Sequence, residues 1–572
     1  MTAVTASLAA PLPWLPRPRP PHCRQRRDLC RGCRANAGPT TTLPPPPTGS
    51  WPEERPWAAV ALSKALDTAG DVALIARRTL LPTYSSDLDS SVADGSLELR
   101  SRRRPVVLIL GSGWAAHSLI KVVDTDTYEV LVVSPRNFFA FTPMLPSCAV
   151  GTVEFRSLLE PVRVANPCVT YLEAECTSLD TTRRVAVCSP VADLPTGGRP
   201  PFRVTYDVAV VAVGEQPATL GVPGVAENCY VLKEVTDAAA LRRRIGEVFD
   251  LASLPGTAAD VKDQLLHFLV VGGGATGVEF AATLAEFVRG DLAASYPPDL
   301  VKRARVTLLQ SGDAILTQFD STLADAALAA LRRDGVTVRL RARVARVAPG
   351  VATLKDGSDI AFGLCLWSAG NSPRGLVTDL RTALQPAGVP IGGAPDDTQA
   401  EAIRGAARGK LLVDPWMRVL GASNVLALGD CATAATTARY AALPATAQVA
   451  GQQGAYAARL INRGFTIGTA GLDAPPPYRP LSWPLSALGG TTAAEVAPPF
   501  EFLSLGLLAG IGEDDALTQV DAGALQLRLS GRLASLLWRS VYVTKQVSFR
   551  NRVLILFDWL KTRAFGRDLS QF

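Results

Sequence analysis

Two segments of the chain join a short apolar strand to a glycine-rich turn and the start of a helix. The apolar run 106–110 leads into Gly111, Ser112, Gly113 and Trp114. The run 267–271 leads into Gly272, Gly274 and Gly277, a complete G-x-G-x-x-G pattern. Such turns let the backbone approach a pyrophosphate and direct the amides of a helix N-terminus toward it. One such pattern alone is weak evidence for a binding site. Two patterns, each placed between a strand and a helix, predict two dinucleotide-binding units.

Two further strands that end in glycine belong with the first unit. The strand 206–213 runs into Gly214, and the strand 424–428 runs into Gly429 and Asp430. A carboxylate at such a strand end can bind a sugar hydroxyl of the cofactor. Because the Gly-Asp pair follows the second unit, we expect the second unit to be inserted into the first. The predicted fold is α/β, with two Rossmann-like dinucleotide-binding domains that hold a flavin and a nicotinamide.

The positive charge of the chain is concentrated near its beginning. The net charge is +6, and residues 1–50 alone hold seven arginines and one acid, Asp28. A basic body that binds nucleic acid is therefore excluded. The composition of 1–50 is typical of an organellar transit peptide, with a retained Pro-rich tail as the alternative. Cys30 and Cys33 have C-x-x-C spacing but no second pair, so we expect no zinc site there.

The remaining composition excludes several classes of site and membrane protein. Three histidines and ten cysteines are scattered, so we expect no metal centre and no disulfide scaffold. The cysteines between the two glycine motifs lack the spacing of a redox pair, which argues against a disulfide reductase. No apolar run is long enough for a transmembrane helix. The Pro-rich stretch 471–499 contains no EF-hand loop, so calcium control is not expected.

The segments before the first glycine motif and at the C-terminal end have no such motif, so we interpret them from composition alone. Residues 56–81 predict a possible helix, and the acidic, Ser-rich stretch 85–94 predicts a linker, so the folded body is expected to begin at Pro105. Residues 532–567 hold eight basic residues and one acid, Asp558, among many aromatic and aliphatic residues. Such a segment can lie in a membrane interface. The alternative is a helical pair that packs on the protein or on a second subunit.

Three more segments carry a resemblance to a known family. They are 134–146 (SPRNFFAFTPMLP), 447–454 (AQVAGQQG) and the tail from Trp538 to Asp568. With the glycine motifs, they resemble the type II, rotenone-insensitive NAD(P)H:quinone oxidoreductases of the two-dinucleotide flavoprotein superfamily. In that family a serine such as Ser134 replaces the acid that usually ends the second strand. The resemblance runs from about 105 to 572, except for the Pro-rich stretch.

The resemblance implies a role for each motif residue. FAD would lie on the first glycine turn, with Ser134, Arg136 and Asn137 near it and Asp430 toward its ribityl chain. NAD(P)H would lie on the second turn, with Glu279 near the nicotinamide. Gln448 and Gln452 would lie on the quinone side of the flavin, unless they serve as helix caps or interior polar contacts.

Gln310 ends the strand after the second turn, where many NADH-specific members carry an acid. An acid there repels the 2′-phosphate of NADPH. Because a neutral amide removes that repulsion, we expect NADPH to be accepted alongside NADH.

The implied function is non-proton-pumping oxidation of NADH, or NADPH, with transfer of two electrons through FAD to a membrane quinone. Two alternatives remain: a soluble FAD-dependent reductase of another acceptor, and a non-enzymatic nucleotide-binding redox sensor. We expect a homodimer on an organelle membrane, with the mitochondrial inner membrane favoured and the plastid thylakoid a close second. The predicted domains are a transit peptide (1–50), a linker (51–104), an FAD-binding domain in two parts (105–235, 386–499), an NAD(P)H-binding domain (236–385) and a C-terminal membrane-anchoring region (500–572).

Overall fold

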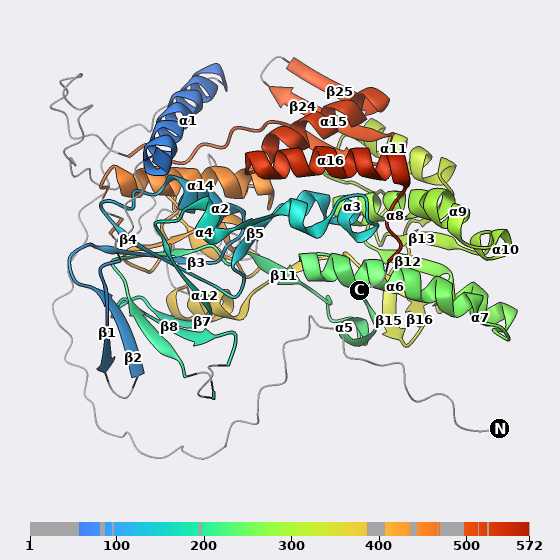
Figure 1. Ribbon diagram of the computed structural model, residues 1–572, viewed down its shortest axis with the longest axis horizontal. Helices are drawn as coiled ribbons and strands as arrows, with labels where there is room; N and C mark the ends of the chain where they lie inside the picture. Colours follow the sequence, from blue (N-terminus) through green and yellow to red (C-terminus); the bar gives the residue numbers. More distant parts are fainter. Residues whose placement is uncertain are drawn as a thin grey trace, which may run out of the picture.

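The computed structural model places two α/β lobes side by side, with the C-terminal helices lying along one face (Figure 1). It describes residues 57–80, 86–93, 96–193, 197–198, 200–385, 407–434, 443–465, 467–468, 497–512, 514–522 and 525–570. The predicted transit peptide, with Cys30 and Cys33, and nearly all of the Pro-rich stretch 471–499 lie outside the described residues.

The first lobe is built on a nine-stranded sheet in the order β1-β2-β9-β8-β7-β4-β3-β10-β21. Its parallel part consists of β7 (Thr170–Asp180), β4 (Glu129–Ser134), β3 (Val106–Leu110), β10 (Val208–Val211) and β21 (Val425–Ala427). All five residues of β3 are buried, as expected for a central parallel strand covered on both faces. Helices α2 (Trp114–Val122), α12 (Gly375–Leu384) and α14 (Ala447–Asn462) accompany this sheet.

The second lobe is built on a four-stranded parallel sheet in the order β14-β13-β12-β18. Its strands are β12 (His267–Val271), β13 (Arg305–Leu309), β14 (Val336–Arg339) and β18 (Leu364–Trp367). The helices around it include α6 (Val235–Ser253), α7 (Ala259–Leu265), α8 (Ala275–Phe287) and α11 (Ser321–Arg333), and β15–β17 (Val344–Ala348, Val351–Leu354, Asp359–Ala361) form a small antiparallel sheet.

The second lobe is inserted into the first, as the order of the motifs predicts. Strand β21 follows the whole second lobe in the chain, yet it pairs in parallel with β10 of the first. The two crossings between the lobes, β11 (Glu215–Pro217) and β19 (Asn371–Pro373), pair antiparallel with each other. The prediction of two Rossmann-like domains, one inside the other, is therefore confirmed.

The segment before Pro105 belongs to the folded body, so the predicted start at Pro105 is wrong. The expected helix is present as α1 (Trp57–Leu80). The stretch 85–94, predicted as a linker, contains strand β1 (Leu88–Ala93), which forms a hairpin with β2 (Ser96–Ser101). Strand β2 then pairs in parallel with β9 (Phe202–Thr205), so the hairpin extends the sheet of the first lobe.

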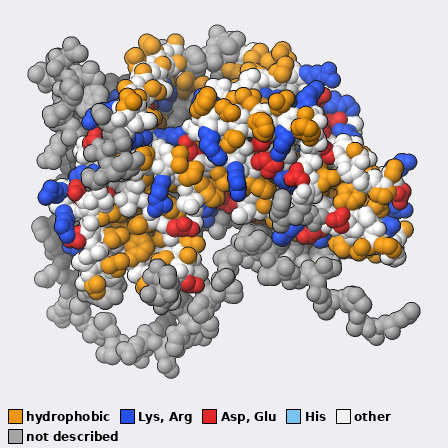
Figure 2. All heavy atoms as spheres, in the orientation of Figure 1, with side chains coloured by type: hydrophobic (Ala, Val, Ile, Leu, Met, Phe, Trp, Pro, Cys, Tyr) orange, Lys and Arg blue, Asp and Glu red, His pale blue; other side chains and the backbone are white. Residues whose placement is uncertain are grey.

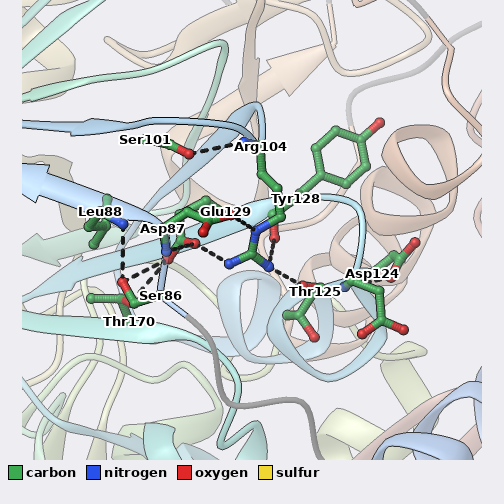
Figure 3. A network of polar contacts seen from close by, with 11 residues as sticks. Ser86, Asp87, Leu88, Ser101, Arg104, Asp124, Thr125, Tyr128, Glu129 and Thr170 are labelled. Carbon is green, nitrogen blue, oxygen red and sulfur yellow. Dashed lines mark hydrogen bonds and ion pairs between the residues drawn. The ribbon is translucent and has the colours of Figure 1, made fainter.

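Arg104 explains why this polar segment is held against the lobe (Figure 3). Its guanidinium bridges the carboxylates of Asp87 and the buried Glu129, and it also donates to the carbonyl oxygen of Thr125 at 2.7 Å. A buried carboxylate such as Glu129 requires a partner of this kind. The ion pairs are long-range in sequence, which is why local composition predicts a linker instead.

The C-terminal region adds a three-stranded sheet and two helices to this body. Strands β23 (Leu507–Gly510), β24 (Ala516–Ala522) and β25 (Leu525–Gly531) are antiparallel. Helices α15 (Arg532–Lys545) and α16 (Phe549–Phe565) follow and lie across both lobes in Figure 1. Within the described part of the chain, no helix combines the length and apolar character needed to cross a membrane.

Candidate functional site

The first glycine turn forms one wall of a cleft in the first lobe. Gly111 has a φ of 115°, and a Cβ at this position would overlap the carbonyl oxygen of Ala212. Only glycine therefore allows β3 and β10 to approach so closely. Gly113 is the N-cap of α2, makes no side-chain cap hydrogen bond, and has open space where its Cβ would be. The first amides of α2 are thus left for a ligand oxygen.

Ser134 stabilises this turn from the end of β4. Its hydroxyl donates to Oγ of Ser112 at 3.0 Å and accepts from the amide of Arg136 at 3.2 Å. The Ser112 hydroxyl donates in turn to the carbonyl oxygen of Phe138 at 3.0 Å. Trp114 is fixed by a hydrogen bond from its indole N–H to Oγ1 of Thr142 at 3.0 Å.

The other walls come from segments far apart in the sequence. The cleft has a volume of about 290 Å³. Nine of the predicted residues line it: Gly111, Ser112, Gly113, Trp114, Ser134, Arg136, Gly214, Gly429 and Asp430. Asn137 is not among the lining residues, and its backbone carbonyl accepts from the amide of Val162.

Helix α14 closes the cleft and positions Gly429. Its N-cap Thr446 lines the cleft, and the Thr446 hydroxyl accepts from the amide of Val449. Gln453, buried on the same helix, accepts from the amide of Gly429 at 2.7 Å. Gln453 is a positioning residue that the motif analysis missed, because only the folded chain shows that its side chain faces the Gly-Asp turn.

Three charged residues that the sequence did not indicate join the predicted Arg136 and Asp430 at the cleft. Glu234 forms ion pairs with Arg136 and, at 4.0 Å, with Arg374, while Lys233 lies 3.8 Å from Asp430. All five line the cleft. Lys233 and Glu234 lie at the start of α6 and Arg374 at the start of α12, and no local sequence pattern marks these three residues.

The second glycine turn repeats the geometry of the first. Gly272 has a φ of 116°, and a Cβ there would lie 2.9 Å from the carbonyl oxygen of Ser368. A Cβ on Gly277 would overlap the carbonyl oxygen of Gly272, so this glycine permits close packing of helix on strand. Gly274 is the N-cap of α8 without a side-chain cap, and open space lies where its Cβ would be. This turn, too, has the donor set for a pyrophosphate.

Gln310 lies directly beside this second turn, at the end of β13. Its side-chain oxygen accepts from the amide of Gly273 at 3.1 Å, and its side-chain nitrogen donates to the carbonyl oxygen of Ala314 at 2.9 Å. The side-chain amide is therefore held beside the second glycine turn, and its place near a dinucleotide ribose stays a prediction.

Glu279 is buried on α8, against the C-terminal region. Its carboxylate accepts from the amide of Gly510 at 2.9 Å. Burial raises the pKa of the Glu279 carboxyl to about 8, and the bond from Gly510 offsets only part of this effect. At neutral pH the carboxyl is therefore mostly protonated, and it can donate as well as accept a proton.

Gln448 and Gln452 are both engaged by the segment that leads into the C-terminal region. Gln448 donates to the carbonyl oxygen of Gly506 and accepts from the amide of Leu505, at 2.9 and 3.3 Å. Gln452 makes the same pair of bonds with the backbone of Leu503, at 2.8 and 3.0 Å. These are the interior polar contacts kept as the alternative for both side chains, so their quinone-side role stays a prediction.

Two lobes of one chain each carry a glycine turn at an uncapped helix N-terminus, and this arrangement defines the class of the protein. The family model described as pyridine nucleotide-disulphide oxidoreductase matches residues 105–454, and the NDH2 C-terminal domain matches residues 505–568. The chain belongs to the alternative NAD(P)H-ubiquinone oxidoreductase family, the NDH2 enzymes, within that class.

Individual relatives agree with this assignment. An internal alternative NAD(P)H-ubiquinone oxidoreductase A1, mitochondrial, from Arabidopsis thaliana is 35% identical over 84% of this chain and 88% of its own length. A probable NADH dehydrogenase from Dictyostelium discoideum is 34% identical over 86% and 97%. The fold matches that of NDH2 from Plasmodium falciparum in complex with NADH, with a TM-score of 0.69 at 22% identity, over 82% of this chain and 100% of that one.

Proposed function

We propose that this chain oxidises NADH, and also NADPH, and passes two electrons through FAD to a membrane ubiquinone without proton translocation. Family membership over most of the chain carries this proposal. FAD supplies the hydride and electron chemistry when bound. The protein provides the two glycine turns that bind the dinucleotides, and the lobes that orient one toward the other.

We assign the predicted residues to these tasks on the geometry around them. The amides at Gly113 and the side chains of Arg136 and Asp430 suit the phosphates and sugar hydroxyls of FAD, because they converge on one cleft. Gly274 offers the equivalent amides to NAD(P)H. Glu279, mostly protonated at neutral pH, is suited to hold or move a proton near the nicotinamide or the quinone.

The C-terminal helix α16 supports a membrane location, because it buries polar side chains against the protein and exposes apolar ones. Asn551, Asp558 and Thr562 are buried against the protein. Asp558 accepts from the amide of Glu154, and Asn551 donates to the carbonyl oxygen of Leu159. Most of its exposed side chains are apolar (Phe549, Val553, Leu556, Phe557, Leu560 and Phe565), and the exposed basic residues are Arg550, Arg552 and Arg563. We propose that the face formed by these apolar side chains, the α16 apolar face, lies in the surface of a bilayer.

The location and assembly of the protein are also part of the proposal. The similar proteins from plants are mitochondrial by name, so we place the enzyme on the mitochondrial inner membrane rather than the thylakoid. The homodimer remains a prediction. Imaging of residues 1–56 fused to a fluorescent protein distinguishes the two organelles, and plastid fluorescence would contradict the proposed location.

A turnover assay tests the activity. The purified full chain is expected to contain FAD and to oxidise NADH only when a short-chain ubiquinone or another acceptor is present. Turnover with a soluble acceptor but none with ubiquinone would favour the soluble reductase. Nucleotide binding without flavin reduction would favour the redox sensor.

A further inference from the structure

The side of helix α1 that packs on the protein carries charged side chains. Asp67 and Asp71 both form ion pairs with Arg459 of α14. Arg78 is almost fully buried, and its guanidinium donates to the carbonyl oxygens of Lys121 and Ala165 at 3.0 and 3.5 Å. A surface helix of a soluble domain normally does the opposite, burying its apolar stripe and exposing its charges.

The outward side of α1 is correspondingly apolar. Leu62, Leu66, Val72 and Leu80 are each more than half exposed. Four alanines on the same side are also exposed: Ala65, Ala69, Ala73 and Ala76. The spacing of three and four residues places these side chains in one stripe along the helix. We call this stripe, with the four larger side chains and the four alanines, the α1 apolar face.

Helix α1 and a residue just before α16 both contact one residue of α2, Lys121. The carbonyl oxygen of Lys121 accepts from Arg78 near the end of α1, and the ammonium of Lys121 donates to the carbonyl oxygen of Val547, just before α16. Figure 1 shows α1, α15 and α16 at the same upper side of the molecule. Figure 2 shows hydrophobic side chains gathered over both regions in that orientation.

We propose that α1 is a second membrane-contact element, whose apolar face lies in the same phospholipid surface as that of α16. The proposal rests on the membrane location proposed for α16. The occupant is a bilayer because both helices are joined to α2 at Lys121 and expose apolar side chains at the same upper side of the molecule as the proposed α16 contact (Figure 1). At 1.5 Å per residue, the 24 residues of α1 give a helix of about 36 Å that lies along the surface. This element precedes the residues that both family models match.

Flotation of the full-length, FAD-loaded protein with phosphatidylcholine–cardiolipin vesicles tests this assignment. The test variant carries Leu66→Glu and Val72→Glu on the α1 apolar face. The matched control carries Leu254→Glu and Val261→Glu at exposed positions at the end of α6 and on α7. A third variant carries Leu556→Glu and Leu560→Glu on α16. Melting temperature, FAD content and NADH turnover with ferricyanide show that each variant is folded.

The expected result is that the α1 variant partitions about tenfold or more weakly into vesicles, because two apolar side chains no longer enter the interface. The control is expected to match the wild type. If the α16 variant loses binding and the α1 variant does not, the role of α1 is refuted while the membrane location stands. If neither loses binding, both proposals fail. A lower oligomeric mass of the α1 variant with unchanged vesicle binding would assign the face to a second copy and also refute the proposal.

Discussion

Gly454 of α14 packs directly against the backbone of Ala115 in α2. A Cβ on Gly454 would overlap the carbonyl oxygen of Ala115. The contact sets how closely the two helices lie, and so where Thr446 lines the cleft of the first lobe and where Gln453 binds the amide of Gly429. The glycine at this position is therefore structural, although it lies within a segment chosen for its resemblance to a family signature.

Gly454→Ala is expected to destabilise the protein by about 2 kcal/mol or more and to lower its FAD content, because backbone must move to admit the methyl group. Gly451→Ala on the same helix is the matched control, since its Cβ would only reach Oγ of Ser118 at 3.4 Å. Thermal unfolding and flavin-to-protein absorbance measure both effects. Equal behaviour of the two variants would contradict this reading of the contact.

Replacing Gly277 and replacing Gly274 in the second turn by alanine are expected to have different effects. Gly277→Ala should lower the melting temperature, because its Cβ overlaps the backbone of Gly272. Gly274→Ala should leave the melting temperature unchanged and raise KM for NADH about tenfold or more, because its Cβ enters open space that the pyrophosphate is proposed to occupy. An unchanged KM in the folded Gly274→Ala variant would remove this turn from the NADH site.

Glu279→Gln is expected to change how stability depends on pH. The pKa of Glu279 is raised from 4.5 to about 8, so the folded state holds a proton that the unfolded state loses. The cost of ionising this buried carboxyl therefore grows as pH rises from about 4.5 to about 8. Glutamine avoids that cost, so the variant should melt at higher temperature than the wild type at pH 9 and at a similar temperature at pH 5. A constant difference across this range would contradict the assigned pKa.

Gln310→Glu is expected to restrict the enzyme to NADH. A carboxylate beside Gly273 would repel the 2′-phosphate of NADPH and lower kcat/KM for NADPH about tenfold to a hundredfold, with little effect on NADH. Steady-state kinetics with both nucleotides measure the change. A wild-type preference for NADH above about a thousandfold would contradict the predicted acceptance of NADPH.

Arg104→Met is expected to destabilise the first lobe by about 3 kcal/mol, because the buried carboxylate of Glu129 loses its partner. Arg102→Met is the control, since its ion pair with Asp89 is exposed. Denaturant unfolding compares the two. Equal stability of both variants would show that the segment before Pro105 adds little to the fold.

The architecture could be predicted from the sequence because its signals are local. A buried strand, a glycine turn and a helix follow one another directly at Gly111 and again at Gly272. The return of β21 could be anticipated from the order of Gly214 and Gly429 along the chain. Each strand, glycine turn and helix start is specified by a few consecutive residues, because backbone sterics require glycine at the turn.

What the sequence did not reveal depends on contacts between distant segments. Arg104 reaches Glu129, Gln453 reaches Gly429, and Glu234 joins Arg136 to Arg374, each through partners that no local pattern specifies. For Gln448 and Gln452 of α14, the sequence predicted a role that the observed contacts do not test. Their spacing resembles a family motif, while in the structure their amides bind the backbone of 503–506.

Anaerobic stopped-flow spectroscopy of the full-length protein tests the central claim most directly. NADH is expected to bleach the visible absorbance of the bound flavin, and a short-chain ubiquinone is expected to restore it at a rate no slower than steady-state turnover. A protein that carries no flavin, or whose flavin is reduced by NADH but is not reoxidised by ubiquinone, would contradict the proposed function.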